Sequence, residues 1–173
     1  MAIEIKHKET GGVLAKVGAR SLESVDLPGA SLDEADLTEA NLTGCDLHGA
    51  SLNRAVLRAA NLSFADLTGA HLRKADLSNA TLNTVELTLA DLSGCNLAGA
   101  DMFGADLFGA DMSSTILDGA WLGGADLQEA RLAGASLKDT KFDSHTRWPE
   151  HFSPEKHGAV LVESTVIKVP KTK

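Results

Sequence analysis

Large apolar residues recur at every fifth position between Leu22 and Phe142. These positions hold Leu throughout, except for Met102, Met112 and Phe142. From Val25 to Thr140, the residue two places before each large residue is small, most often Ala, with Val, Cys or Thr at the remainder. A period of five matches neither the 3.6-residue turn of an α-helix nor the two-residue alternation of a strand. A helix would spread these leucines around its whole circumference, so the pattern excludes a Leu-rich amphipathic helix.

The polar positions follow the same period. Asp or Asn stands between the small and the large residue at 13 of 24 places, and Gly stands two places after the large residue at 11 of 24. The repeat A-(D/N)-L-x-x therefore runs through residues 21–142 without an insertion. Two inward residues in every five predict a coil that turns a corner in each pentapeptide, with Gly where the corner is tight. Because one pentapeptide cannot bury its Leu, successive coils must stack and pair their backbones like parallel strands.

This pattern resembles that of the bacterial pentapeptide-repeat proteins, and the resemblance covers residues 21–142. It implies an all-β fold, a right-handed quadrilateral parallel β-helix in which four pentapeptides close one coil of about twenty residues. The 120 residues of repeat would then form about six coils. At a strand spacing of about 4.8 Å, six coils would make a shaft roughly 29 Å long.

Residues 1–20 are expected to cap the first coil. The alternating segment 3–6, the turn signal Thr10-Gly11-Gly12 and the strand-like segment 13–17 together predict a β-hairpin. Such a hairpin would cover an unpaired edge that otherwise invites polymerisation.

Residues 143–173 are expected to cap the last coil. Trp148 and Phe152, beside two prolines, predict an apolar plug, and the segment from Lys168 to Lys173 is expected to be frayed. The apolar surface of residues 142–160 could equally form the interface of an end-to-end homodimer. The sequence therefore leaves open both the choice between cap and interface and that between monomer and dimer.

Charge narrows the possible functions. The net charge is −8 and the sequence pI is about 5.1, which argues against a nucleic-acid-binding surface. Residues 21–140 carry 18 acids and 6 bases, whereas both flanking segments are mildly basic. No apolar run is long enough to cross a membrane, and the charged residues 1–20 do not resemble a signal peptide. We therefore expect a cytoplasmic protein that binds another protein, and neither nucleic acid nor a membrane.

The residues that could carry chemistry point away from catalysis. Cys45 and Cys95 lie fifty residues apart, which places them on opposite faces of the coil, too far apart to form a disulfide. His145, His151 and His157 do not have a zinc-site spacing. The chain contains no nucleophile elbow and no phosphate-binding glycine loop, and an uninterrupted frame offers no loop from which to build an enclosing pocket. We expect no catalytic residue, no cofactor and no metal.

Residues twenty apart should stack, and this places acids in one column. The members of this acidic column are Asp26, Asp46, Asp66, Glu86, Asp106 and Asp126. Neighbouring carboxylates would be about 4.8 Å apart, and their face is expected to hold no Lys or Arg. Another face mixes both signs and can neutralise itself; its charged and titratable residues are Asp33, Glu34, Arg54, His71, Arg73, Lys74, Asp91, Asp111 and Arg131.

Two interpretations of the acidic column remain open. Asp and Asn readily bind nearby backbone N–H groups, so the acids could be structural. Alternatively, a ladder of carboxylates could imitate a row of DNA phosphates. The family that this chain resembles includes quinolone-resistance and topoisomerase-inhibitor proteins that work in this way, although those proteins are longer and several carry projecting loops. Such mimicry would weaken with salt.

Outward positions also hold large apolar residues, which indicate a docking patch on two adjoining faces. This candidate docking patch consists of Phe64, Leu89, Phe103, Phe108 and Trp121. The sequence therefore predicts a rigid, non-catalytic interaction module that binds an unidentified protein through the faces of its shaft. The alternative is a DNA-mimicking modulator of a type II topoisomerase such as gyrase.

Overall fold

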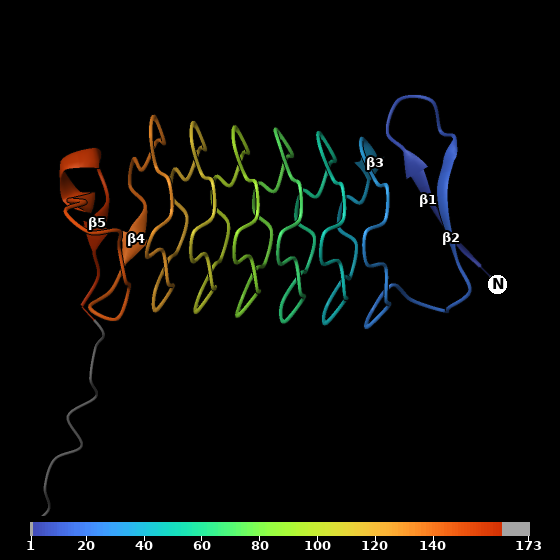
Figure 1. The fold of residues 1–173 in the computed structure, drawn as a ribbon, viewed down its shortest axis with the longest axis horizontal. Coiled ribbons are helices and arrows are strands. Elements are labelled where there is room, and N and C mark those ends of the chain that lie inside the picture. Colours follow the sequence, from blue (N-terminus) through green and yellow to red (C-terminus); the bar gives the residue numbers. More distant parts are fainter. Residues whose placement is uncertain (1, 164–173) are drawn as a thin grey trace, which may run out of the picture.

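The computed structural model describes residues 2–163, which form an elongated shaft with a different small element at each end (Figure 1). The shaft is a stack of coils joined by isolated parallel bridges between residues twenty apart, such as Asp46↔Asp66 and Asn41↔Asn61. The bridges form four ladders, one for each pentapeptide of a coil. The five-residue period thus becomes a four-sided coil whose neighbours hydrogen-bond along the shaft axis.

Each pentapeptide turns its corner through one local hydrogen bond. The N–H of the small residue returns to the carbonyl of the large residue before it, as in Ala35 N–H to Leu32 O (3.1 Å). The residue before the small one has a positive φ at every corner from Ser24 to Asp139, whether or not it is Gly. This is the left-handed conformation that the third residue of a type II turn requires, so Gly is favoured there but not obligatory.

The core is a column of the two inward residues of each repeat. The large residues from Leu32 to Leu127 are at most 3% exposed, and Ala fills most of the small positions between them. Where the small residue is Cys or Thr, its thiol or hydroxyl donates to a Leu carbonyl of the preceding coil, as in Cys95 Sγ to Leu72 O (2.7 Å) and Thr140 Oγ1 to Leu117 O (2.7 Å). Polar atoms in these slots are therefore satisfied without water.

At the N-terminal end, β1 (Ile3–His7) and β2 (Val13–Val17) form an antiparallel hairpin. β1 also pairs with β3 (Ala35–Asp36) of the shaft, so the sheet order is β2-β1-β3. Ile5 and Val17 are buried in the same core cluster as the leucines of the shaft. The hairpin is thus fixed to the shaft by backbone pairing and by apolar contact.

At the C-terminal end, one ladder of bridges continues past Phe142. Its last bridge joins Asp126 to Arg147, so the separation there is one residue longer than the regular twenty. β4 (Lys141–Phe142) pairs in parallel with β5 (Val160–Leu161), and the 3₁₀ helix η1 (Pro154–His157) lies between them in the sequence. The rings of Phe142, Trp148, Phe152 and His157 contact one another in series, with centroid separations between 4.6 and 5.5 Å. The expected frayed segment, Lys168–Lys173, lies outside the described residues.

Within residues 2–163, no helix has both the length and the apolar character needed to cross a membrane.

Candidate functional site

The acidic column exists as a continuous ladder. Parallel bridges join each member to the next, from Asp26 to Asp126. Stacking alone does not show a binding role, because the same carboxylates also have local partners.

Those partners are backbone N–H groups two residues ahead. In the acidic column, Oδ1 of Asp46, Asp66, Asp106 and Asp126 accepts such an N–H at 2.8–3.1 Å. Asp and Asn make the same bond on the other three faces, for example Asp76 with Ser78 N–H. Of the Asp and Asn residues in this repeat slot, Asp26 is the exception, because Pro28 has no N–H to offer. The bond caps a donor that the ladder does not use, which supports the structural interpretation of the acids.

One basic residue reaches the acidic column, against expectation. Arg147 forms the next rung after Asp126, and its guanidinium lies 2.8 Å from Asp126 Oδ2. The separation is 21 residues instead of twenty, because the chain has one extra residue after the last regular repeat. The expectation of a face without Lys or Arg is therefore wrong at its C-terminal end.

His48 also approaches the acidic column. Its Nδ1 lies 2.8 Å from Asp46 Oδ1, and hydrogen bonds from the His48 backbone and ring hold the pKa of Asp46 below its ordinary value. Asp46, His48 and Asp66 each offer a potential ligand atom within 4.8 Å of the others, the one such group of three among residues 2–163. The group is open to solvent: the side chains of Asp46 and His48 are 37% and 57% exposed.

The members of the candidate docking patch do not form one continuous surface. Phe64, Leu89 and Phe103 are 69%, 66% and 49% exposed, whereas Phe108 and Trp121 are half-buried. Leu89 leans over Gly109, next to Phe108, and Trp121 lies over Gly123. Phe103 reaches toward the neighbouring Gly124. The patch is thus a pair of small apolar areas together with the separate side chain of Phe64.

Two of these apolar residues occupy corners with unfavourable backbone geometry. Phe64 has a φ of 60° and Leu89 a φ of 58°, in the left-handed region that bulky residues rarely adopt. Eleven equivalent corners carry Gly, which adopts this geometry without strain. Phe64 and Leu89 therefore combine a local conformational cost with apolar exposure, and neither feature stabilises the fold.

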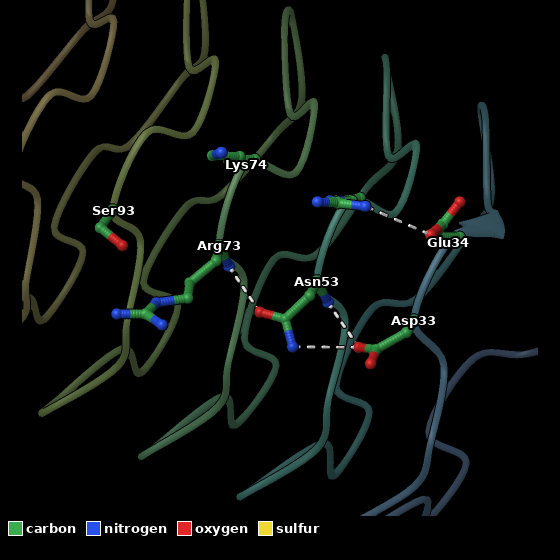
Figure 2. A pocket seen from close by; sticks show the side chains of 7 residues that line it. Asp33, Glu34, Asn53, Arg73, Lys74 and Ser93 are labelled. Carbon is green, nitrogen blue, oxygen red and sulfur yellow. Dashed lines mark hydrogen bonds and ion pairs between the residues drawn. The ribbon is translucent and has the colours of Figure 1, made fainter.

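The mixed-charge face contains a surface hollow of about 580 Å³ (Figure 2). Side chains from successive coils line this charged hollow: Asp33, Glu34, Asn53, Arg54, Arg73, Lys74 and Ser93. Asp33 Oδ1 accepts hydrogen bonds from the Asn53 backbone N–H (2.8 Å) and side-chain amide (3.1 Å), and Asn53 Oδ1 accepts the Arg73 N–H (3.0 Å). These bonds form an axial chain that fixes the floor of the hollow.

The sequence predicted that an uninterrupted repeat builds no enclosing pocket, and this hollow is open to solvent. Loops are not needed, because long side chains standing on neighbouring coils leave space between them. The hollow does not enclose its polar groups: the side chains of Arg54 and Arg73 are 62% and 65% exposed. It is a groove between side chains and lacks the desolvated interior that perturbs catalytic groups.

The two cysteines do not form a disulfide with each other, and the three C-terminal histidines each contact a different partner. Cys45 and Cys95 are free and buried, and burial raises the pKa of the Cys95 thiol to about 12. His157 stacks on Phe152, while His145 and His151 face different carboxylates, those of Asp143 and Glu150.

The fold defines a class, the parallel β-solenoid with five-residue sides. A sequence model of the family described as pentapeptide repeats matches this chain in eight copies, over residues 21–54, 50–88, 86–122 and 117–144. Because these matches cover well over half of the 173 residues, the chain belongs to the pentapeptide repeat family. The predicted family and its all-β, β-helical class are thereby confirmed.

Several solved structures are similar to this chain. Rfr23, a pentapeptide repeat protein from the cyanobacterium Cyanothece 51142, is 34% identical, with a TM-score of 0.43; the match covers 63% of this chain and 64% of that chain. HetL from the cyanobacterium Nostoc sp. strain PCC 7120, involved in heterocyst differentiation regulation, is 25% identical over 83% of this chain and 87% of its own, with a TM-score of 0.48. QnrB1, a plasmid-mediated fluoroquinolone resistance protein, is 18% identical over 73% and 77%, with a TM-score of 0.36. No curated protein matches the chain.

Proposed function

We propose that this protein is a rigid, non-catalytic interaction module that binds another protein through the side of its shaft. The observation that carries the proposal is the pair of exposed apolar residues, Phe64 and Leu89, held in left-handed backbone geometry. Strained positions that do not serve the fold are typical of functional surfaces. Phe103, about half exposed, is a further large apolar side chain at an outward position of the shaft.

The rigid shaft supports this role. Backbone hydrogen bonds of 2.6–3.1 Å join every coil to the next, so the outward side chains keep fixed positions relative to one another. A surface that is ordered before binding loses little conformational entropy when a partner docks. Apolar side chains near the centre of such a surface commonly contribute most of the binding energy.

The test is affinity capture from the lysate of the protein's native cells, compared across variants by quantitative mass spectrometry. Phe103→Ser and Leu89→Ser should each lose a partner that the unmodified protein retains. Ile116→Ser is the matched control, because Ile116 is 43% exposed but lies on a different ladder. A partner that remains bound to Phe103→Ser and Leu89→Ser, or that is lost equally from Ile116→Ser, would contradict the proposed surface.

DNA mimicry is the second candidate, favoured by the unbroken stack of carboxylates from Asp26 to Asp126. Its mechanism would be electrostatic competition for a basic DNA-binding surface of a type II topoisomerase, with a strong salt dependence. Because Oδ1 caps backbone N–H groups, charge reversal would disturb the fold as well as the charge. Asp66→Asn, Glu86→Gln and Asp106→Asn remove charge and keep an acceptor oxygen.

Gyrase supercoiling, assayed at low and at moderate salt, tests this second candidate. Inhibition by the unmodified protein that weakens with salt and disappears in the triple Asp66→Asn, Glu86→Gln, Asp106→Asn variant would place mimicry first. Absence of any effect at tens of micromolar protein would remove it.

A further inference from the structure

The charged hollow gathers the bases of an acidic shaft. Residues 21–140 carry 18 acids and 6 bases, and three of those bases, Arg54, Arg73 and Lys74, line this one hollow. Lys8 of the N-terminal hairpin joins them, because its Nζ donates to the Arg54 carbonyl at 2.7 Å. Four cations thus stand close together on a surface that is elsewhere strongly negative.

The acids of the hollow are already engaged. Asp33 Oδ1 accepts hydrogen bonds from the Asn53 backbone N–H and from Ser51 Oγ (2.6 Å). These bonds hold the Asp33 side chain against the next coil. Glu34 lies at the N-terminal end, where Lys8, His7 and Arg54 all approach its carboxylate within 3.8 Å. Glu34 therefore serves the attachment of the hairpin and contributes little negative charge to the rest of the hollow.

The cations at the other end keep donors available. Arg73 contacts Asp91 Oδ2 through its Nε at 2.7 Å, and this contact leaves the two terminal amino groups of the guanidinium for another acceptor. Within the described part of the chain, Lys74 forms no ion pair. Its aliphatic stem rests above Gly94, where a Cβ would lie only 3.3 Å from Lys74 Cγ. The side chains of Arg73 and Lys74 extend along the shaft, away from Asp33 and Glu34 (Figure 2).

We propose that the charged hollow receives a short acidic segment of a partner protein, whose carboxylates pair with Arg54, Arg73 and Lys74. The inference rests on the proposed function, to which it adds the chemistry of the partner. The lining from Asp33 to Ser93 crosses three coil spacings, about 14 Å, which suits about four extended residues. Guanidinium groups bind carboxylates with two parallel hydrogen bonds. A long polyanion such as nucleic acid fits less well, because beyond the hollow it would meet the acids of the shaft.

The test uses fluorescence anisotropy with a fluorescein-labelled hexaglutamate peptide and the full-length protein. Hexalysine and a six-nucleotide single-stranded DNA serve as comparison probes. The test variant is Arg73→Gln with Lys74→Gln. The matched control is Arg131→Gln with Lys138→Gln, which changes the net charge equally and also removes an Arg–Asp ion pair, that of Arg131 with Asp111. Circular dichroism checks that both variants are folded.

Hexaglutamate should bind the unmodified protein and the control variant. Its affinity should fall about tenfold or more in the Arg73→Gln, Lys74→Gln variant, and fall for all proteins as salt rises. No measurable hexaglutamate binding at low salt, or an equal loss in both variants, overturns the inference. DNA binding as tight as hexaglutamate binding also overturns it, since the site would then be a general polyanion site. A failure of the proposed function would instead appear as a captured partner that is insensitive to Phe103→Ser, a result that this peptide assay does not affect.

Discussion

Replacing Asp106 separates the structural role of the acidic column from its charge. Asp106 Oδ1 accepts the Phe108 N–H at 3.0 Å, and like-charged neighbours, Glu86 and Asp126, stand on the adjacent rungs. Asp106→Asn removes the charge and keeps an acceptor oxygen at the same place. Asp106→Ala removes both. The difference in stability between the two variants therefore isolates the hydrogen bond, because the charge change is common to them.

The magnitudes follow from these contacts. Loss of the charge relieves repulsion of about 0.2–1 kcal/mol for each like-charged neighbour, and Arg147 already balances Asp126. Asp106→Asn should therefore be neutral or slightly stabilising. Asp106→Ala leaves a partly buried N–H without its acceptor, so it should be less stable than Asp106→Asn by about 1–2 kcal/mol. For a chain of this size, the difference corresponds to about 2–8 °C in Tm.

Thermal and urea denaturation, followed by circular dichroism, measure this difference. Equal stability of Asp106→Ala and Asp106→Asn would refute the argument that the carboxylate caps the turn. A marked loss of stability in Asp106→Asn alone would show that the negative charge itself supports the fold, which the stacked geometry does not explain.

Three further predictions concern the core, the thiols and the corners. Leu77→Ala should destabilise the fold by about 2–5 kcal/mol in urea denaturation, because Leu77 is 1% exposed, whereas Leu89→Ala should change stability little, because Leu89 is 66% exposed. Cys95 should not react with Ellman's reagent at pH 8 until the protein unfolds. Burial raises the pKa of its thiol from 9.0 to about 12. The folding stability contributed by the buried neutral thiol should therefore be complete below pH 9 and decline as pH rises toward 12. Ala59→Gly should raise Tm by a few degrees, because Ala59 has a φ of 54° and Gly there relieves a strain of about 1 kcal/mol; no change would contradict this assignment of strain.

The inward residues show why so much of the fold could be predicted. A period of five fixes which two residues of each pentapeptide face inward. Stacking of four-sided coils then places residues twenty apart side by side, such as Asp46 and Asp66, whatever side chains the intervening residues carry. The backbone conformation at the corners could be predicted from the sequence only where the corner residue is Gly. Gly marks some corners, but residues such as Glu34 and Phe64 adopt the same positive φ, because the hydrogen bonds of adjacent coils impose it regardless of local preference.

The parts that were missed depend on side-chain reach and on one extra residue. Arg147 joins the acidic column because Thr146, Arg147 and Trp148 repeat the small–polar–large order of a pentapeptide, displaced by one position. Thr146 Oγ1 even donates to the Leu122 carbonyl, as polar residues in the small slot do. That displaced triplet was a usable signal. The charged hollow offered no comparable signal, since it depends on how the long side chains of Arg54, Arg73 and Lys74 are directed.

The measurement that tests the account most directly compares stability and partner capture in the double variant Phe64→Gly, Leu89→Gly. The account holds that both residues strain the backbone in order to present an apolar surface. The variant should therefore melt at a higher temperature than the unmodified protein and at the same time lose the captured partner. Ala59→Gly with Asn79→Gly, at equivalent corners with φ of 54° and 56°, should gain stability and keep the partner. A Phe64→Gly, Leu89→Gly variant that retains the partner, or that is less stable than the unmodified protein, would contradict the central claim.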